Sequence, residues 1–149
     1  MLLPFTDSLI ETSKGDRELC ALADRHYSRG KVGATQFMPP GRTLVLRDTV
    51  GLIVFGWLWC YDGLRFDRQN GFCCTIFRNE TTRRSSDIIL EAEAAAAARW
   101  GANRMFTYVD PTAIQSANPG YCFKMAGWKH CGYSQSGLHL LVKTPKKAL

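Results

Sequence analysis

The pattern of hydrophobic and polar residues along the chain predicts both helices and strands. Apolar positions at helical spacing, bounded by capping or helix-stopping residues, predict helices over Asp16–Arg29, over Ser85–Trp100, and from Asn118-Pro119 to Gly127. Runs rich in β-branched and aromatic residues predict strands over Thr43–Arg47, Leu52–Cys60, Gly71–Arg78, Arg104–Val109, Trp128–Cys131 and Leu138–Lys143. The first two strands, on either side of Thr49-Val50-Gly51, are expected to form a hairpin.

The order of these elements predicts one domain. The chain has 149 residues, of which 46% are hydrophobic, and this is enough for one proper core. Strand, helix and strand follow one another around Ser85–Trp100, which favours a right-handed parallel crossover. We therefore expect a single domain over residues 1–149, of the α/β (α+β) class, with a mixed central sheet flanked by helices.

The formal net charge of +6 favours an anionic partner, either nucleic acid or a phosphate-bearing cofactor. A solvated basic surface is the alternative reading of the same charge. The longest apolar run, Gly51–Cys60, has half the length needed to span a bilayer. The N-terminus lacks the basic stretch, apolar core and cleavage site of a signal peptide. We therefore expect a cytoplasmic protein with no membrane partner.

Six cysteines are present, and no two of them have Cys-x-x-Cys spacing. Zinc binding is therefore poorly supported. In a chain without an export signal, cysteines are expected to be reduced and mostly buried as small apolar residues.

The segment Asn118-Pro-Gly-Tyr-Cys-Phe-Lys-Met-Ala-Gly-Trp128 is similar to a motif of the Gcn5-related N-acyltransferases, an asparagine nine residues before a Gly-aromatic pair. The order of elements from Arg78 to Gly132 also resembles the acyl-donor half of that family, which implies a mostly antiparallel sheet. Two departures stand out. The family's glycine-rich phosphate loop is replaced by a stretch without glycine, and Phe123 replaces the tyrosine that protonates the leaving thiolate. Tyr121 lies roughly 200° around the helix from that position.

A narrower resemblance, to the phage Mom group of DNA-modifying proteins, covers most of the chain from residue 26 to 128. It rests on His26-Tyr27-Ser28-Arg29, Phe77-Arg78-Asn79-Glu80, Ser85-Ser86, Thr107-Tyr108-Val109-Asp110-Pro111 and Asn118-Pro119-Gly120-Tyr121-Cys122-Phe123. The resemblance implies a phage-encoded enzyme that converts the adenine N6 amino group of double-stranded DNA to its N6-carbamoylmethyl form and so protects the DNA from restriction. It also implies iron, with His26, Tyr27 and Asp110 as ligand candidates.

Four residues are candidates for the chemistry. His26 and Tyr27 lie at the end of the first predicted helix, where His26 could act as a base or metal ligand beside the phenol of Tyr27. Position in the helix alone instead favours a His26 that hydrogen-bonds the last carbonyls of the helix. The resemblance reverses this order and favours the functional role. Asp110 is either a proton acceptor or metal ligand, or an Asp-Pro turn former. Tyr121 is a proton donor, a base-stacking residue or a core aromatic.

Four further residues are candidates for binding the small donor, which is acyl-CoA-like or of another kind. Arg78, at a strand end before the long helix, can hold a carboxylate or phosphate, or pair with Glu80 on the surface. Ser85 and Ser86 can form an anion site at the helix N-terminus and can also cap it. Asn118 belongs to the motif shared with the acyltransferases.

Two rival functions remain open. One is a conventional acetyl-CoA-dependent N-acetyltransferase that acts on a protein or a small amine. The other is a non-catalytic DNA-binding, anti-restriction module. We expect the tryptophans to be core residues, with only Trp57 and Trp59 sharing a strand face that can reach a cleft, and His130 and His139 to be structural. The oligomeric state, including a homodimer, stays open.

Overall fold

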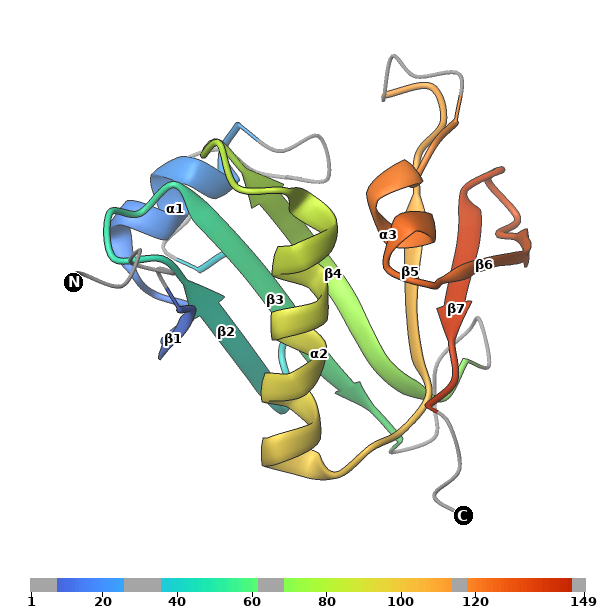
Figure 1. The fold of residues 1–149 in the computed structure, drawn as a ribbon, viewed down its shortest axis with the longest axis horizontal. Coiled ribbons are helices and arrows are strands. Elements are labelled where there is room, and N and C mark those ends of the chain that lie inside the picture. The colour runs from blue at the N-terminus through green and yellow to red at the C-terminus, as the bar shows by residue number, and fades with distance from the viewer. Residues whose placement is uncertain (1–7, 26–35, 62–68, 114–117, 146–149) are drawn as a thin grey trace, which may run out of the picture.

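The computed structural model describes residues 8–25, 36–61, 69–113 and 118–145 (Figure 1). Its seven strands form one sheet in the order β1-β2-β3-β4-β5-β7-β6. The strands are β1 (Ile10–Thr12), β2 (Thr43–Arg47), β3 (Ile53–Cys60), β4 (Gly71–Asn79), β5 (Met105–Val109), β6 (Lys129–Tyr133) and β7 (His139–Lys143). The helices are α1 (Arg17–Ala23), α2 (Ser85–Trp100) and α3 (Tyr121–Met125).

The sheet is mixed and mostly antiparallel, as expected. Only β4 and β5 run parallel, and α2 is the crossover between them. The other neighbouring strands pair antiparallel, including the predicted hairpin of β2 and β3. The parallel pair therefore joins two antiparallel halves, β1 to β4 on one side and β5, β7 and β6 on the other.

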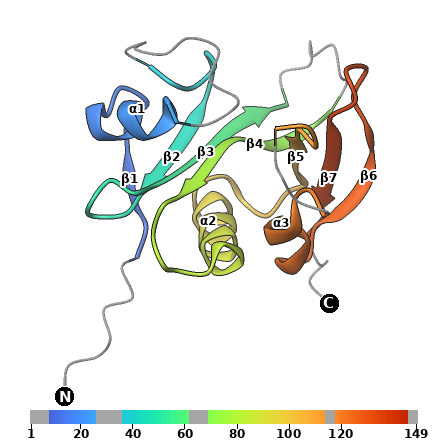
Figure 2. The same ribbon diagram turned by 90° about the horizontal axis from the view of Figure 1, so that it is seen from above.

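The helices cover both faces of the sheet (Figure 2). Helix α1 packs on one face, where Leu19 lies against Val54 and Ile76. Helices α2 and α3 lie on the opposite face, over a core that includes Trp57 and Phe72. Burial of this apolar area is the main force that holds the layers together. No helix in the described part of the chain is long and apolar enough to cross a membrane.

Helix α2 has the predicted bounds and ends at Gly101 as predicted, but its predicted N-terminal caps are wrong. Arg84 occupies the N-cap position, and no side chain caps the helix there. Ser85 instead accepts a hydrogen bond from Asn79, with 3.1 Å between Oγ and Nδ2, and Ser86 is buried. The helix stays in place through its buried apolar stripe, Ile88, Ile89, Ala92 and Ala96.

Helix α3 begins later than the sequence predicted. Its N-cap is Gly120, in the left-handed conformation with φ +75°, and not Asn118. A Cβ built on Gly120 would lie 2.4 Å from Cδ1 of Leu141, so a side chain at this position would collide with β7. The close approach of the chain to the sheet at Gly120, together with its backbone angle, sets where the helix starts.

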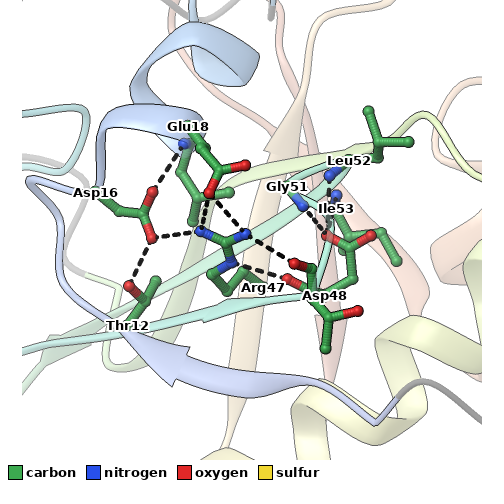
Figure 3. Close-up of polar contacts among 10 residues, drawn as sticks. Thr12, Asp16, Glu18, Arg47, Asp48, Gly51, Leu52 and Ile53 are labelled. Carbon is green, nitrogen blue, oxygen red and sulfur yellow. Dashed lines mark hydrogen bonds and ion pairs between the residues drawn. The ribbon is translucent and has the colours of Figure 1, made fainter.

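A buried polar network fixes α1 to the turn between β2 and β3 (Figure 3). The Arg47 guanidinium binds Asp16, with 2.8 Å between Nη1 and Oδ2, and also reaches Glu18. Asp16 is the N-cap of α1, because its Oδ1 accepts a hydrogen bond from the Leu19 backbone N–H. Next to Arg47, one carboxylate oxygen of Asp48 accepts the backbone N–H groups of the turn, those of Gly51, Leu52 and Ile53.

Strand β1 was not predicted, and α1 is shorter than predicted in the described residues. Strand β1 has three residues, two of them exposed, which is too short and too polar for a period-two pattern to stand out. Helix α1 ends at Ala23, with Asp24 as its C-cap.

Candidate functional site

Strand β4 carries a β-bulge at Thr75, and its pairing with β5 stops at the same point. Cys74 lies opposite Trp57 and Ile76 opposite Gly56, so β4 has one residue more than β3 here. The parallel pairing of β4 with β5 covers only Phe72 to Cys74. A bulge bends its strand and increases its twist. Beyond the bulge β4 therefore bends away from β5, and the two strands diverge in Figure 1.

Among the described residues, the divergence leaves the edge of β4 beyond Cys74 without a partner strand. The Thr107 hydroxyl donates to the Cys74 carbonyl, with 2.8 Å between the oxygens, and so satisfies the last carbonyl of the paired stretch. Glu80 donates its N–H to the Leu52 carbonyl of the neighbouring strand. Along an antiparallel strand, the backbone groups of successive residues point alternately toward one neighbouring strand and the other. Since Glu80 bonds β3, the N–H and C=O groups of Phe77 and Asn79 point away from β3, toward the open side. Such an edge can receive an extended ligand that carries amide groups.

Arg78 lies on this part of β4 and is engaged in an ion-pair network. The Glu80 carboxylate accepts from Nε of Arg25 at 2.8 Å and from Nε of Arg78 at 2.5 Å. These two guanidiniums, Arg25 first, lower the pKa of Glu80 to about 2. The surface pairing with Glu80, one of the two sequence readings of Arg78, is therefore confirmed.

Arg78 also contacts the chain directly before His26-Tyr27. Its Nη1 donates to the Arg25 carbonyl oxygen at 2.8 Å. His26 and Tyr27 lie outside the described residues. The contact with Arg25 nevertheless ties the β4 end to the peptide unit that precedes His26.

The loop between β4 and α2 is organised by Asn79. Its Nδ2 donates to the Arg83 carbonyl at 2.8 Å and to Ser85, while its Oδ1 accepts the Thr81 backbone N–H at 2.9 Å. The Ser85 hydroxyl therefore serves this loop, and the buried Ser86 is not an open anion ligand. The Asp87 and Ile88 N–H groups already donate to the Arg84 carbonyl, so the groups left for a donor are the N–H groups at the very start of α2 and the exposed Arg84.

Asp110 follows β5 and forms a turn. Its Oδ1 accepts from the hydroxyl and the backbone N–H of Thr112, at 2.7 and 2.9 Å, and more weakly from the Ala113 N–H. The Thr112 hydroxyl, followed by the backbone bonds, lowers the pKa of Asp110 below its usual value. The turn-forming reading of Asp110 is thus correct, and the carboxylate remains anionic.

Helix α3 presents Tyr121 and Phe123 in opposite directions. Tyr121 is 56% exposed, so the core reading of this residue is wrong, whereas Phe123 is buried. The half-turn between them, expected from helix geometry, is confirmed. Asn118, just before the helix, accepts a hydrogen bond at its Oδ1 from Nζ of Lys124 at 2.6 Å.

Two phenylalanines connect the flanks of the diverging strands. Phe77 of β4 and Phe123 of α3 have ring centroids 6.0 Å apart, edge to face. Arg78, Asn79 and Ser85 therefore lie on one flank, and Asp110, Asn118 and Tyr121 on the other, with the two rings between. Sequence reasoning assigned no site role to Phe77. The signal for Phe123 was its place at the family's tyrosine position.

The remaining aromatic and sulfur residues are mostly structural. Trp57 is fully buried and donates Nε1–H to the Ala92 carbonyl at 2.9 Å, so it does not reach a cleft. Trp59 lies under the guanidinium of Arg42, 4.4 Å from the ring centroid. All six cysteines are free thiols; three are buried, two half-buried and one, Cys131, exposed.

A pocket of about 270 Å³ lies elsewhere, beside the C-terminal half of α2. Leu90, Ala94 and Ala97 form its wall, and the ion pair of Glu93 with Lys143, 2.7 Å long, forms one end. It includes none of the predicted site residues.

The iron implied by the resemblance stays a prediction. The described residues contain no group of three or more His, Cys, Asp and Glu side chains able to hold a metal ion. Asp110 is the one candidate ligand within the described ranges, and its Oδ1 is engaged by its own turn. We therefore assign no step to iron.

No protein-family model, no curated protein and no solved structure matches this chain.

Proposed function

We propose that this protein is a transferase that acts on an amine, and that its acceptor is the adenine N6 amino group of DNA. The product is the N6-carbamoylmethyl form, which protects the DNA of a phage from restriction. The observation that carries the proposal is the bulge-driven divergence of β4 and β5, because five predicted site residues lie on its two flanks. The sequence resemblance to the Mom group supplies the acceptor.

The acceptor sets the first chemical demand. The lone pair of the adenine amino group is delocalised into the ring, so its proton must leave as the new C–N bond forms. A carboxylate with a lowered pKa is a weak proton acceptor, so Asp110 is better suited to orient the amino group through a hydrogen bond. We assign proton removal to His26, with Asp110 as the alternative.

The donor sets the second demand. As the C–N bond forms, the bond between the carbamoylmethyl carbon and its leaving group breaks, and the leaving group needs a proton. Tyr121, with its exposed phenol, supplies that proton or orients the base. The open edge at Phe77 and Asn79 holds the extended part of the donor, and the first turn of α2 with Arg84 holds its anionic part.

In duplex DNA the target amino group is paired. The enzyme must therefore extrude the base, at a cost of a few kcal/mol, before the amino group reaches the flanks of β4 and β5. The net charge of +6 favours electrostatic binding to the DNA phosphates, and this binding should weaken as salt is added.

The test is expression in bacteria, digestion of genomic DNA to nucleosides and mass spectrometry. We expect a deoxyadenosine whose amino group carries one carbamoylmethyl group. Asp110→Asn should lower its yield at least tenfold in folded protein, whereas Glu11→Gln, an equal change at the far edge of the sheet, should not. Unmodified adenosine in cells that contain folded wild-type protein would contradict the proposal.

Coenzyme A separates the proposal from the conventional acetyltransferase. Because the loop before α2 has no glycine, its backbone cannot wrap a pyrophosphate in the usual way. Calorimetric titration with acetyl-CoA should therefore show weak binding. Tight binding, together with acetylation of an amine and unmodified DNA, would favour that rival.

A further inference from the structure

Three aromatic rings are in mutual contact on the outer hairpin of β6 and β7. The ring centroids lie 4.8 Å apart for His130 and Tyr133, 4.9 Å for His130 and His139, and 5.2 Å for Tyr133 and His139. Tyr133 is 68% exposed and His130 is also exposed. His139 forms the base of the cluster, and its Nδ1 is buried without a partner among the described residues.

These rings share the face of the sheet that α3 covers. His130 lies opposite Leu141, and Tyr133 lies opposite His139; residues directly opposite one another in an antiparallel pair share a face. Leu141 is the residue against which the start of α3 packs, at Gly120. The exposed Tyr121 follows Gly120 directly, so it lies on the same face as the three rings.

A register shift makes this arrangement possible. Pairing along β6 skips Cys131, between His130 opposite Leu141 and Gly132 opposite Leu140. Without the extra residue, His130 and Tyr133, three positions apart, would point to opposite faces of the sheet. The bulge therefore gathers rings that a regular strand would separate.

The segment that carries these rings is basic. Asp110 is the last acidic residue of the chain, and residues 111–149 contain five lysines and no Asp or Glu. Most of the net charge of +6 therefore comes from the last quarter of the sequence. Lys124 of α3 lies on the side of the sheet that the rings share, whereas the exposed Lys129, opposite Val142, points to the other face. A basic surface attracts phosphates, and exposed rings stack on bases whose faces are free.

We infer that His130, Tyr133 and His139 form a ring surface that stacks on unpaired bases of DNA, with Lys124 of the neighbouring α3 beside the phosphates. The inference rests on the proposed function for the choice of DNA. It deepens that proposal by placing the contact with opened DNA on α3, β6 and β7, next to Asp110 and Tyr121. Fully paired DNA hides the faces of its bases and is the weaker ligand of this surface.

The test compares two fluorescent single-stranded probes, an oligothymidylate and an abasic strand with the same number of phosphates, by anisotropy with the full chain. Wild-type protein should bind the strand with bases about 5- to 100-fold more tightly. Tyr133→Ala should remove most of that preference, and Tyr133→Phe should keep it. Lys124→Ala should weaken the binding of both strands equally and reduce the salt slope by about 1.

Two matched variants control for charge and for apolar exposure. Arg17→Ala removes an exposed cation from α1, on the opposite face of the sheet, and Val50→Ala trims an exposed apolar residue in the β2–β3 turn. Both should leave the preference for bases unchanged. Unfolding curves show whether each variant is folded.

Equal affinity of the wild-type protein for the abasic strand or for an intact duplex would overturn the inference, and so would a folded Tyr133→Ala that keeps the preference. These outcomes differ from a failure of the proposed function. Base-dependent binding without adenine modification contradicts only the proposed enzymatic function. Adenine modification without any preference for unpaired bases contradicts only the ring surface.

Discussion

At the scale of single residues, the pairing of Glu80 with two arginines has a consequence for acid stability. Its pKa falls from an ordinary value of 4.5 to about 2 in the folded protein, because Arg25 and Arg78 favour the carboxylate. A lowered folded-state pKa contributes stability that is fully present above pH 4.5 and is lost as the pH falls toward 2.

Glu80→Gln should therefore lower the free energy of unfolding at pH 7, and the difference from wild type should shrink between pH 4.5 and 2. Urea unfolding at a series of pH values measures this difference, and carbon NMR of the side chain measures the pKa directly. A Glu80 carboxyl that titrates near its ordinary value would show that the ion pairs do not persist in solution.

Other residues show what the sequence could and could not supply. The sequence placed Arg78 at the end of a strand and named Glu80 as an alternative partner, because two charges this near along the chain are easily paired. The partners of Arg47 could not be predicted in this way, since Asp16 and Glu18 lie far along the chain and meet it only after folding. Tyr121 was left with several readings because helical geometry gives its direction relative to Phe123 but not which of the two faces the core.

At the scale of elements, Asp48 is the residue that defines the turn between β2 and β3. One carboxylate oxygen accepts three backbone N–H groups at 2.9 to 3.0 Å (Figure 3). Asp48→Ala leaves these donors without their acceptor and should destabilise the protein by about 3 kcal/mol. Asp48→Asn keeps the accepting oxygen and should cost less.

Urea unfolding of the two variants at pH 7 measures this difference. If Asp48→Asn were as unstable as Asp48→Ala, the turn would not depend on the accepting oxygen. The Arg47 network that holds α1 lies next to this turn, so a disordered turn should also loosen α1. Faster amide hydrogen exchange at Leu19 and Leu22 would report this loosening.

Element bounds were predictable where one signal ran without interruption. The helix over Ser85–Trp100 and the strand over Thr43–Arg47 have the predicted bounds, because apolar periodicity marks both of their ends. The bulge of β4 was not predictable. Before Thr75, the even-numbered residues Phe72 and Cys74 of β4 face α2, and after Thr75 the odd-numbered Phe77 faces it. This switch from even to odd positions leaves no signal in the amino-acid composition. The close approach of Gly120 to β7, which delays α3, is likewise a tertiary effect.

At the scale of the whole molecule, the two antiparallel halves of the sheet are joined by three residue pairs of β4 and β5. The Thr107 hydroxyl bonds the Cys74 carbonyl at the end of this junction, and both residues are buried. Thr107→Val keeps the shape of the side chain but leaves the carbonyl unpaired. We expect a loss of about 1–2 kcal/mol in the free energy of unfolding.

Thr75→Val is the matched control, since its hydroxyl is only half-buried and lies 3.5 Å from the Gly56 carbonyl. It should cost less than Thr107→Val in urea unfolding. Amide exchange at Phe72 to Cys74 should also rise more in Thr107→Val. Equal effects of the two changes would mean that the junction is held by side-chain packing alone.

The bulge at Thr75 bears on how such a site can arise. The open edge of β4 does not depend on a nucleophile, a metal or a glycine loop. It exists because β4 has one residue more than the paired stretch of β3. Thr75 is the extra residue, so its removal would take away the mismatch with β3 that bends β4. The length of β4, one residue more than β3 can match, therefore decides whether this edge stays apart from β5.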